Sequence, residues 1–219
     1  MSAAPRVVSV NVGGPREVEW RGHRVRTSIW KSPTAARVGV TRLNIDGDEQ
    51  SDLSVHGGVH KAVYAYPLEH YEFWRSQLPG AELEWGAFGE NLTIEGLLED
   101  DVRVGDRLRI GSAEFEVTQP RFPCFKLGIR FGRDDILNRF LESGRSGFYL
   151  SVVTKGAIAA GDAIQFEPRA EHDVTISDVA AAYATGGEDR NLLRRILEVP
   201  TLPGGLREHF SKRLKARPR

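Results

Sequence analysis

The most reactive side chain in the sequence is its single thiol, Cys124. It lies in the stretch 119–127, where two prolines restrict the backbone on its N-terminal side. Arg121 and Lys126 place positive charge near the sulfur, which favours the thiolate over the thiol. A thiolate can be a nucleophile, a sulfur carrier or a ligand to a soft metal. The competing interpretation is a buried cysteine that acts as a small hydrophobic residue.

A second polar region, residues 46–61, holds four carboxylates and two histidines. These oxygen and nitrogen donors suit a metal site or a proton donor beside a cofactor. Gly57 and Gly58 allow backbone amides to approach an anion closely, and Lys61 follows them. The alternative is an acidic surface loop that precedes a strand.

A third region, residues 85–97, is rich in glycine and contains the pair Glu90 and Asn91. This pair suits the polar edge of a heterocyclic ring, although turn chemistry at the start of a strand explains it equally well. Lys31 is a lone cation two residues before Pro33. The sequence has no Gly-x-x-x-x-Gly-Lys loop, no Gly-x-Gly-x-x-Gly and no Gly-x-Ser-x-Gly elbow.

Short apolar stretches separated by turn residues predict a mainly-β fold that positions these groups. The two residues Arg21-Gly22 are typical of a tight hairpin between neighbouring strands. Many short strands at this spacing indicate a closed or nearly closed β-barrel. The strands are predicted at 6–12, 16–20, 23–28, 38–45, 61–66, 91–95, 102–110, 114–119, 148–153 and 163–166.

Two helices are predicted within the barrel region, one starting at Pro67 and one over residues 133–143. The composition changes near Pro168, and three short amphipathic helices follow it. We therefore expect a β-barrel domain over residues 1–168 and a three-helix extension over residues 169–219.

The overall composition narrows the function classes. The 219 residues carry 30 basic and 30 acidic side chains, so the net charge of zero argues against nucleic-acid binding by charge alone. No apolar run approaches the length of a membrane helix, and the N-terminus lacks the apolar core of a signal peptide. We expect a cytoplasmic protein that does not engage a membrane. One cysteine excludes an internal disulfide and any multi-cysteine metal site within one chain.

Four separated motifs together resemble the MOSC domain, the molybdenum cofactor sulfurase C-terminal domain, and within it the YiiM-like proteins. They span most of residues 6–168, and the helical tail is similar to the extension found behind the YiiM-like barrel. The first motif is Gly47-Asp48-Glu49-Gln50. The second runs from Val55-His56-Gly57-Gly58 through Lys61-Ala62-Val63 and Tyr66-Pro67 to Glu69-His70-Tyr71 and Trp74. The third is Phe88-Gly89-Glu90-Asn91-Leu92-Thr93, and the fourth is Gln119-Pro120-Arg121 with Pro123-Cys124 and Lys126-Leu127.

The resemblance implies a β-barrel and a molybdenum cofactor in its molybdopterin form, with Cys124 as the protein ligand to the metal. Asp48 and His56 would stand near the open face of the metal as catalytic residues. Glu90 and Asn91 would bind the donor and acceptor edges of the pterin. The groups expected to hold the pterin phosphate are Lys31, Gly57, Gly58, Lys61 and Arg121.

The activity implied by the resemblance is reduction of N-hydroxylated compounds, such as hydroxylaminopurine-type base analogues, to amines. It would be an oxidoreductase reaction that needs no pyridoxal phosphate, with protons from His56 or Asp48. The chain has no flavin or iron–sulfur motif, so a separate flavoprotein would supply the electrons. Two alternatives remain: a sulfur carrier with a persulfide on Cys124, and a non-catalytic carrier of the molybdenum cofactor.

Overall fold

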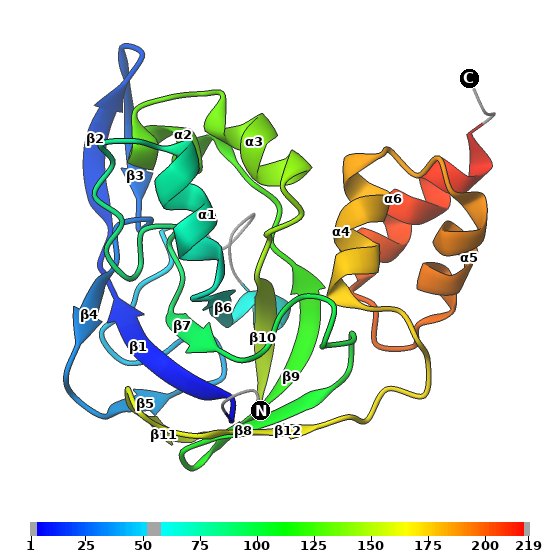
Figure 1. The fold of residues 1–219 in the computed structure, drawn as a ribbon, viewed down its shortest axis with the longest axis horizontal. Coiled ribbons are helices and arrows are strands. Elements are labelled where there is room, and N and C mark those ends of the chain that lie inside the picture. Colours follow the sequence, from blue (N-terminus) through cyan, green and yellow to red (C-terminus); the bar gives the residue numbers. More distant parts are fainter. Residues whose placement is uncertain (1–3, 52–57, 217–219) are drawn as a thin grey trace.

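A computed structural model describes residues 4–51 and 58–216 of the chain. His56 and Gly57, two of the predicted site residues, lie outside the described residues. Among the described residues, strands outnumber helices, and the helices form one group over the sheet and another at the C-terminus (Figure 1).

The centre of the fold is an eight-stranded sheet. Its neighbouring strands are antiparallel except for β6 and β7, which run parallel and are connected through α1 (His70–Gln77). In spatial order the strands are β12 (Ile164–Glu167), β8 (Arg107–Ile110), β9 (Ala113–Pro120), β10 (Phe148–Thr154), β6 (Val63–Pro67), β7 (Leu92–Glu95), β1 (Arg6–Val12) and β4 (Ser32–Thr34). Two short pairs accompany the sheet: β2 (Arg16–Trp20) with β3 (His23–Thr27), and β5 (Val38–Val40) with β11 (Gly156–Ile158).

The sheet curls until the start of β1 approaches the segment before β12. The Val7 N–H donates to the Asp162 carbonyl (2.9 Å), and the Gly161 N–H donates to the Val7 carbonyl (2.8 Å). A further bond joins the Ile164 N–H to the Pro5 carbonyl (2.8 Å). The ladder nevertheless has an open strand order ending at β12 and β4. The mainly-β prediction is confirmed, whereas a closed barrel is not.

At β6, near the centre of the sheet, both faces of the sheet are buried. Val63 and Ala65 point into one apolar cluster, while Tyr64 and Tyr66 point into a second. Because successive side chains of a strand point to opposite faces, and both faces are covered here, every residue of β6 is buried. The second cluster is covered by α1, α2 (Phe125–Phe131) and α3 (Ile136–Glu142).

The C-terminal helices pack on the sheet as well as on one another. They are α4 (Ile176–Ala184), α5 (Arg190–Glu198) and α6 (Gly204–Lys215), and they gather on one side of the molecule, with α4 against β9 (Figure 1). Val179, Leu193 and Phe210 belong to the same apolar cluster as the sheet residues. The predicted boundary at residue 168 falls between β12 and α4, and the independence of the two domains stays a prediction.

Two sequence predictions about helices need correction. Pro67 ends β6 instead of starting the first helix, which begins three residues later at His70. The helix α2 was missed because its seven residues include Gly128, which has low helix propensity, and show little amphipathic pattern. The predicted hairpin is confirmed: Arg21 and Gly22 join β2 to β3, and both have positive φ (54° and 77°), as a two-residue type I′ turn requires.

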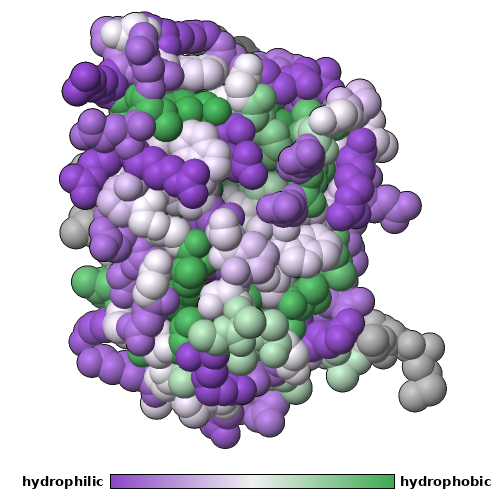
Figure 2. Space-filling view, turned by 90° about the vertical axis from the view of Figure 1, so that its left-hand side faces the viewer, coloured by the Kyte–Doolittle hydropathy of each residue, from purple (hydrophilic) through white to green (hydrophobic). Residues whose placement is uncertain are grey.

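The side of the molecule that carries the β2–β3 hairpin has a mixed surface. Hydrophilic side chains dominate it, and apolar groups lie in several separate patches between them (Figure 2). No helix of the described residues is long and apolar enough to cross a bilayer.

Candidate functional site

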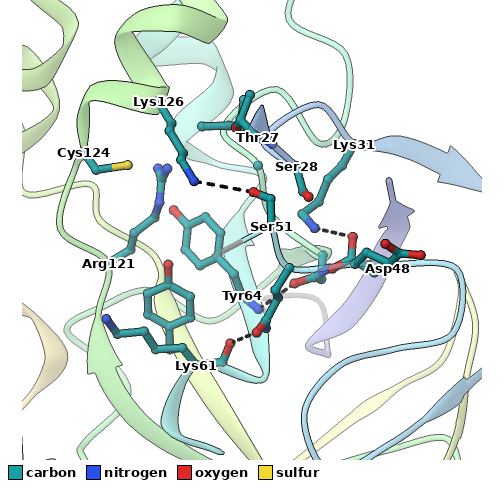
Figure 3. Close-up of a pocket in the computed structure, with 16 residues that line it drawn as sticks. Thr27, Ser28, Lys31, Asp48, Ser51, Lys61, Tyr64, Arg121, Cys124 and Lys126 are labelled. Atoms are coloured by element: carbon teal, nitrogen blue, oxygen red, sulfur yellow. Dashed lines mark hydrogen bonds and ion pairs between the residues drawn. The ribbon is translucent and has the colours of Figure 1, made fainter. Parts of the chain in front are cut away.

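The described part of the chain forms a polar pocket of about 580 Å³, counted out to its open mouth. Figure 3 shows Cys124, Arg121 and Lys126 on one side of it and Lys31 with Asp48 on the other. The pocket thus unites residues that are far apart in the sequence. Its lining residues are Thr27, Ser28, Ile29, Lys31, Asp48, Glu49, Gln50, Ser51, Lys61, Tyr64, Gly89, Asn91, Arg121, Cys124, Lys126 and Tyr149.

Cys124 lies half-buried where the chain leaves β9 and enters α2. Three cations, Lys61, Arg121 and Lys126, line the same pocket. The thiolate form of Cys124 raises the pKa of Arg121 and opposes the lowering that burial imposes on Lys61. The electropositive surroundings predicted for the thiol are therefore present in the folded chain.

Arg121 is the least expected of these cations because it is 6 % exposed. Its guanidinium lies over the rings of Tyr64 (5.1 Å) and Phe140 (5.3 Å). Burial opposes its charge, but Tyr64, Tyr149 and Cys124 more than offset that effect, and the pKa of Arg121 is raised. The Nη1 atom is buried without a hydrogen-bond partner among the described residues. A buried guanidinium with an unused donor is a site for an anion.

On the opposite wall, Lys31 and Asp48 form a buried ion pair. Asp48 Oδ1 also accepts from the Gly13 N–H (3.1 Å), and Oδ2 accepts from the Asn91 side-chain amide (3.0 Å). Burial lowers the pKa of Lys31, and Asp48 opposes that shift. Three donors occupy the two oxygens of this carboxylate, an arrangement that fits an anchor for Lys31 and Asn91 better than the predicted proton donor.

Three of the four buried side-chain atoms without hydrogen-bond partners in the described structure line this one pocket. They are Ser28 Oγ, Gln50 Oε1 and Arg121 Nη1. Because buried polar atoms are rarely left unpaired, their convergence points to a polar ligand. Ser28 and Gln50 were not predicted as site residues. Ser28 directly follows β3, and Gln50 lies in an acidic loop. Neither position carries a local signal for a site, although Gln50 belongs to the motif Gly47-Asp48-Glu49-Gln50.

Glu90 does not line the pocket, contrary to its predicted place at a ring edge of the cofactor. It is fully buried, and its carboxylate accepts from the N–H groups of Gly86 (2.8 Å) and Phe88 (3.1 Å). The Tyr71 and Thr93 hydroxyls also donate to it. Burial raises its pKa, and the hydrogen bonds oppose that rise. Its neighbour Asn91 does reach the pocket, so Glu90 shapes the turn that presents Asn91.

The remaining predicted groups lie near the pocket or outside the described residues. Gly58 precedes the 3-10 turn η1 (Val59–Lys61) with φ of 92°, a conformation that favours glycine, and it is not a lining residue. Within residues 4–51 and 58–216, no three His, Cys, Asp or Glu side chains converge to hold a metal ion. A metal at Cys124 would therefore need further donors from outside these ranges or from a bound cofactor.

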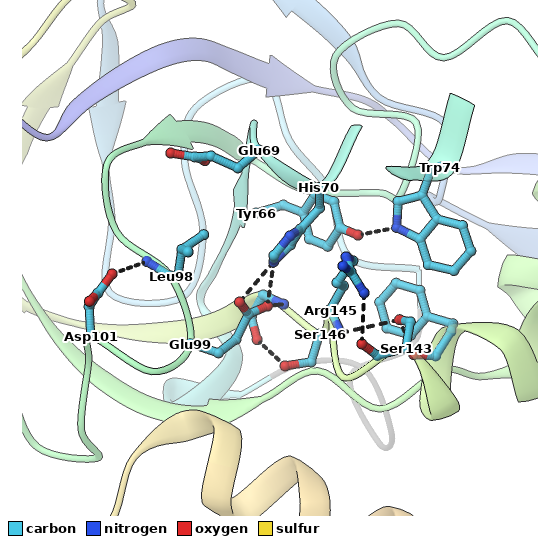
Figure 4. Close-up of polar contacts among 12 residues, drawn as sticks. Tyr66, Glu69, His70, Trp74, Leu98, Glu99, Asp101, Ser143, Arg145 and Ser146 are labelled. Carbon is cyan, nitrogen blue, oxygen red and sulfur yellow. Dashed lines mark hydrogen bonds and ion pairs between the residues drawn. The ribbon is translucent and has the colours of Figure 1, made fainter. Parts of the chain in front are cut away.

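A second buried polar cluster lies beside α1 (Figure 4). His70 Nε2 lies 2.8 Å from Glu99 Oε2, and Glu99 Oε1 accepts from the Gly147 N–H (2.6 Å). Nearby, Trp74 donates to the Tyr66 hydroxyl (2.6 Å). None of the unpartnered buried atoms of the described structure belongs to this cluster.

Comparison with known proteins finds relatives that match most of this chain. The YflK protein of Bacillus subtilis is 36% identical over 207 residues, covering 94% of this chain and 93% of that protein. The YiiM protein of Escherichia coli is 39% identical over 157 residues, 71% of this chain and 70% of that protein. A protein of Gibberella moniliformis named "Reductase" is 31% identical over 182 residues, 82% of this chain but 32% of that longer protein.

Solved structures agree with the sequence relatives. The crystal structure of YiiM from Geobacillus stearothermophilus matches with a TM-score of 0.80 and 34% identity, covering 96% of this chain and 99% of that one. The structure of YiiM from Escherichia coli matches with a TM-score of 0.75 and 27% identity, covering 95% and 92%. The MOSC domain family matches residues 52–165, and the YiiM-like 3-alpha helix domain matches residues 174–217. This chain therefore belongs to the MOSC domain family and carries the C-terminal helical domain of its YiiM-like members.

Proposed function

We propose that this chain binds the molybdenum cofactor in the pocket beside Cys124 and reduces N-hydroxylated compounds to amines. The observation that carries the proposal is the buried, incompletely bonded guanidinium of Arg121 in the same pocket as the chain's single thiol. MOSC membership and the reductase name of one relative support an oxidoreductase over other classes.

The residues present fit the chemistry of the cofactor. A molybdenum–dithiolene unit takes a soft protein donor, and the Cys124 thiolate is one. The pterin carries a phosphate, for which Arg121, Lys61 and Lys126 supply positive charge. Lys31 is neutralised by Asp48, so it contributes a positioned donor more than net charge. The unpartnered Ser28 and Gln50 atoms suit the polar edges of a heterocycle.

The reaction balances with two electrons and two protons: the N–O bond of R–NHOH breaks, and R–NH₂ and water form. When bound, the cofactor would supply the two-electron redox chemistry. The protein residues would bind and orient the substrate, and His56 is the proposed proton donor because Asp48 is already committed to three partners. Electrons would come from a separate flavoprotein, whose identity the proposal does not require.

The test is elemental analysis of the full chain produced in a host that makes the cofactor, with Cys124→Ser beside the wild type. We expect about one molybdenum per wild-type chain, and an altered or absent metal centre in the variant, because serine replaces a soft donor by a hard one. Reduction of a hydroxylaminopurine with a chemical electron donor should fall to background in Cys124→Ser, while the circular dichroism of the fold is unchanged.

Any other result of these assays favours one of two alternative functions. Metal-free protein with labile sulfur on the thiol would replace this proposal by the sulfur carrier. Bound molybdenum without any reductase activity would leave a non-catalytic carrier of the cofactor. The sulfur carrier leaves the convergence of the unpartnered Ser28, Gln50 and Arg121 atoms unexplained, which is why it takes second place.

A further inference from the structure

The C-terminal helices contact the segment that bears the thiol, although none of their residues lines the pocket. Phe122, two residues before Cys124, stacks on Tyr183 of α4 with ring centroids 3.8 Å apart and planes 22° apart. Tyr183 stacks in turn on His209 of α6 at 5.0 Å and 25°. Three aromatic rings therefore connect two tail helices to the site segment.

Residues 121–124 need such support because they form neither strand nor helix. The segment runs from the end of β9 at Pro120 to the start of α2 at Phe125. On one side, Arg121 is held over the rings of Tyr64 and Phe140, which belong to the aromatic part of the main fold. On the other side, Phe122 is held by the tail. The adjacent side chains of Arg121 and Phe122 thus fix the segment between the main fold and the C-terminal helices.

We propose that the three-helix tail positions Cys124 and Arg121 by clamping Phe122 in the Phe122–Tyr183–His209 stack, with Tyr183 as the positioning residue. The tail then has a role at the site without touching a ligand. This inference is independent of whether the thiol binds molybdenum or carries sulfur, because either chemistry needs the sulfur held against the pocket cations.

The stack also connects the site segment to the core of the tail. Phe122 is partly buried and packs against the apolar cluster shared by sheet and tail. His209 is backed by Phe210 in an edge-to-face contact at 5.2 Å, and Phe210 is fully buried. The stack is therefore anchored in the tail core at one end and ends on the site segment at the other.

The test uses the full-length chain from a host that lacks the molybdenum cofactor, so that its result does not depend on the proposed activity. Three variants are compared with the wild type: Tyr183→Ala, which removes the middle ring; Tyr183→Phe, which keeps it; and Leu197→Ala, a matched control. Leu197 is also a partly buried tail residue packed on the same cluster, but it is outside the stack.

Two measurements report on the segment. One is hydrogen–deuterium exchange in peptides covering residues 121–127, and the other is alkylation of Cys124 by iodoacetamide at about pH 9.5, where an ordinary thiol is mostly thiolate. In Tyr183→Ala we expect both rates to rise several-fold because the segment opens locally. Tyr183→Phe and Leu197→Ala should behave as the wild type.

The proposal is overturned if Tyr183→Ala leaves both rates unchanged, or if Leu197→Ala raises them as much, since the effect would then be general loosening of the tail. If Tyr183→Ala does not fold, Tyr183→Leu decides, because leucine keeps apolar volume but offers no ring face. Failure of the molybdenum assay described above would leave this result untouched.

Discussion

The two buried polar clusters of this protein differ in how completely their hydrogen bonds are made. Around His70 and Glu99, the carboxylate is met by an imidazole and a backbone N–H, and the Tyr66 ring packs edge-to-face against that imidazole. In the pocket, Arg121 is equally buried, yet an Nη1 atom of its guanidinium has no partner in the described structure. Both clusters contain charged side chains in the interior, so burial of charge by itself does not identify a functional site. What marks the pocket is that three buried atoms without hydrogen-bond partners in the described structure converge on it.

The two clusters nevertheless share a link. Tyr64 lines the pocket and supports Arg121, and its hydroxyl donates to the Ser146 carbonyl (2.8 Å) next to Gly147. Tyr64 therefore connects the His70–Glu99 cluster to the pocket wall that carries Arg121. Substitutions in the His70–Glu99 cluster should lower stability, whereas substitutions in the pocket should weaken ligand binding.

The largest expected effect is on stability, in Glu99→Ala. The substitution leaves His70 and the Gly147 N–H without their buried acceptor, which should lower the free energy of unfolding by about 3 kcal/mol. Urea unfolding followed by tryptophan fluorescence measures the loss. Glu99→Gln, which keeps one acceptor oxygen, should lose less, and molybdenum content of the folded fraction should match the wild type. Loss of the metal with unchanged stability would reverse the assignment of the two clusters.

The next effect is on binding, in Arg121→Met. Methionine removes the charge and unused donor while keeping an apolar stem over Tyr64 and Phe140, so the free energy of unfolding should change by less than about 1 kcal/mol. Affinity for the anionic cofactor should fall roughly 10- to 100-fold, as expected for loss of a charge-assisted hydrogen bond. Cofactor retention during dialysis provides the measurement.

Arg130→Met is the matched control for that comparison. Arg130 also has a buried unpartnered atom, Nε, but it does not line the pocket. Equal loss of cofactor in both variants would mean that net charge, and not the place of Arg121, governs binding.

The smallest effect is expected for Ser28→Ala. The Ser28 hydroxyl makes no hydrogen bond in the described structure, so its removal should leave the free energy of unfolding unchanged or raise it by a few tenths of a kcal/mol. Cofactor retention should weaken several-fold if the hydroxyl meets the ligand. Ser76→Ala serves as the control because Ser76 is exposed, its hydroxyl donates to the Phe73 carbonyl, and it is not a lining residue. Retention identical in Ser28→Ala and wild type would remove Ser28 from the site.

Much of the fold was predictable because local sequence rules operate over a few residues. Short apolar stretches between turn residues marked β1, β2 and β9, and Arg21-Gly22 marked the hairpin. Amphipathic spacing marked the three tail helices. The signal failed where it was short or ambiguous: α2 contains a glycine, and Pro67 suits either the end of a strand or the first turn of a helix.

By itself, the sequence identified the candidate reactive group, a single cysteine preceded by two prolines, and predicted the positive charge of Arg121 and Lys126 near it. Only the tertiary structure decided which distant groups meet it. Asp48 is held by Gly13, Lys31 and Asn91, which are distant from it in the sequence. The carboxylate of Glu90 instead turns inward to the nearby N–H groups of Gly86 and Phe88, and away from the pocket lining. Ser28, Gln50 and the ring of Tyr183 likewise became relevant only in the folded chain. Whether a polar atom is satisfied depends on all its neighbours in space, and that cannot be seen along the chain.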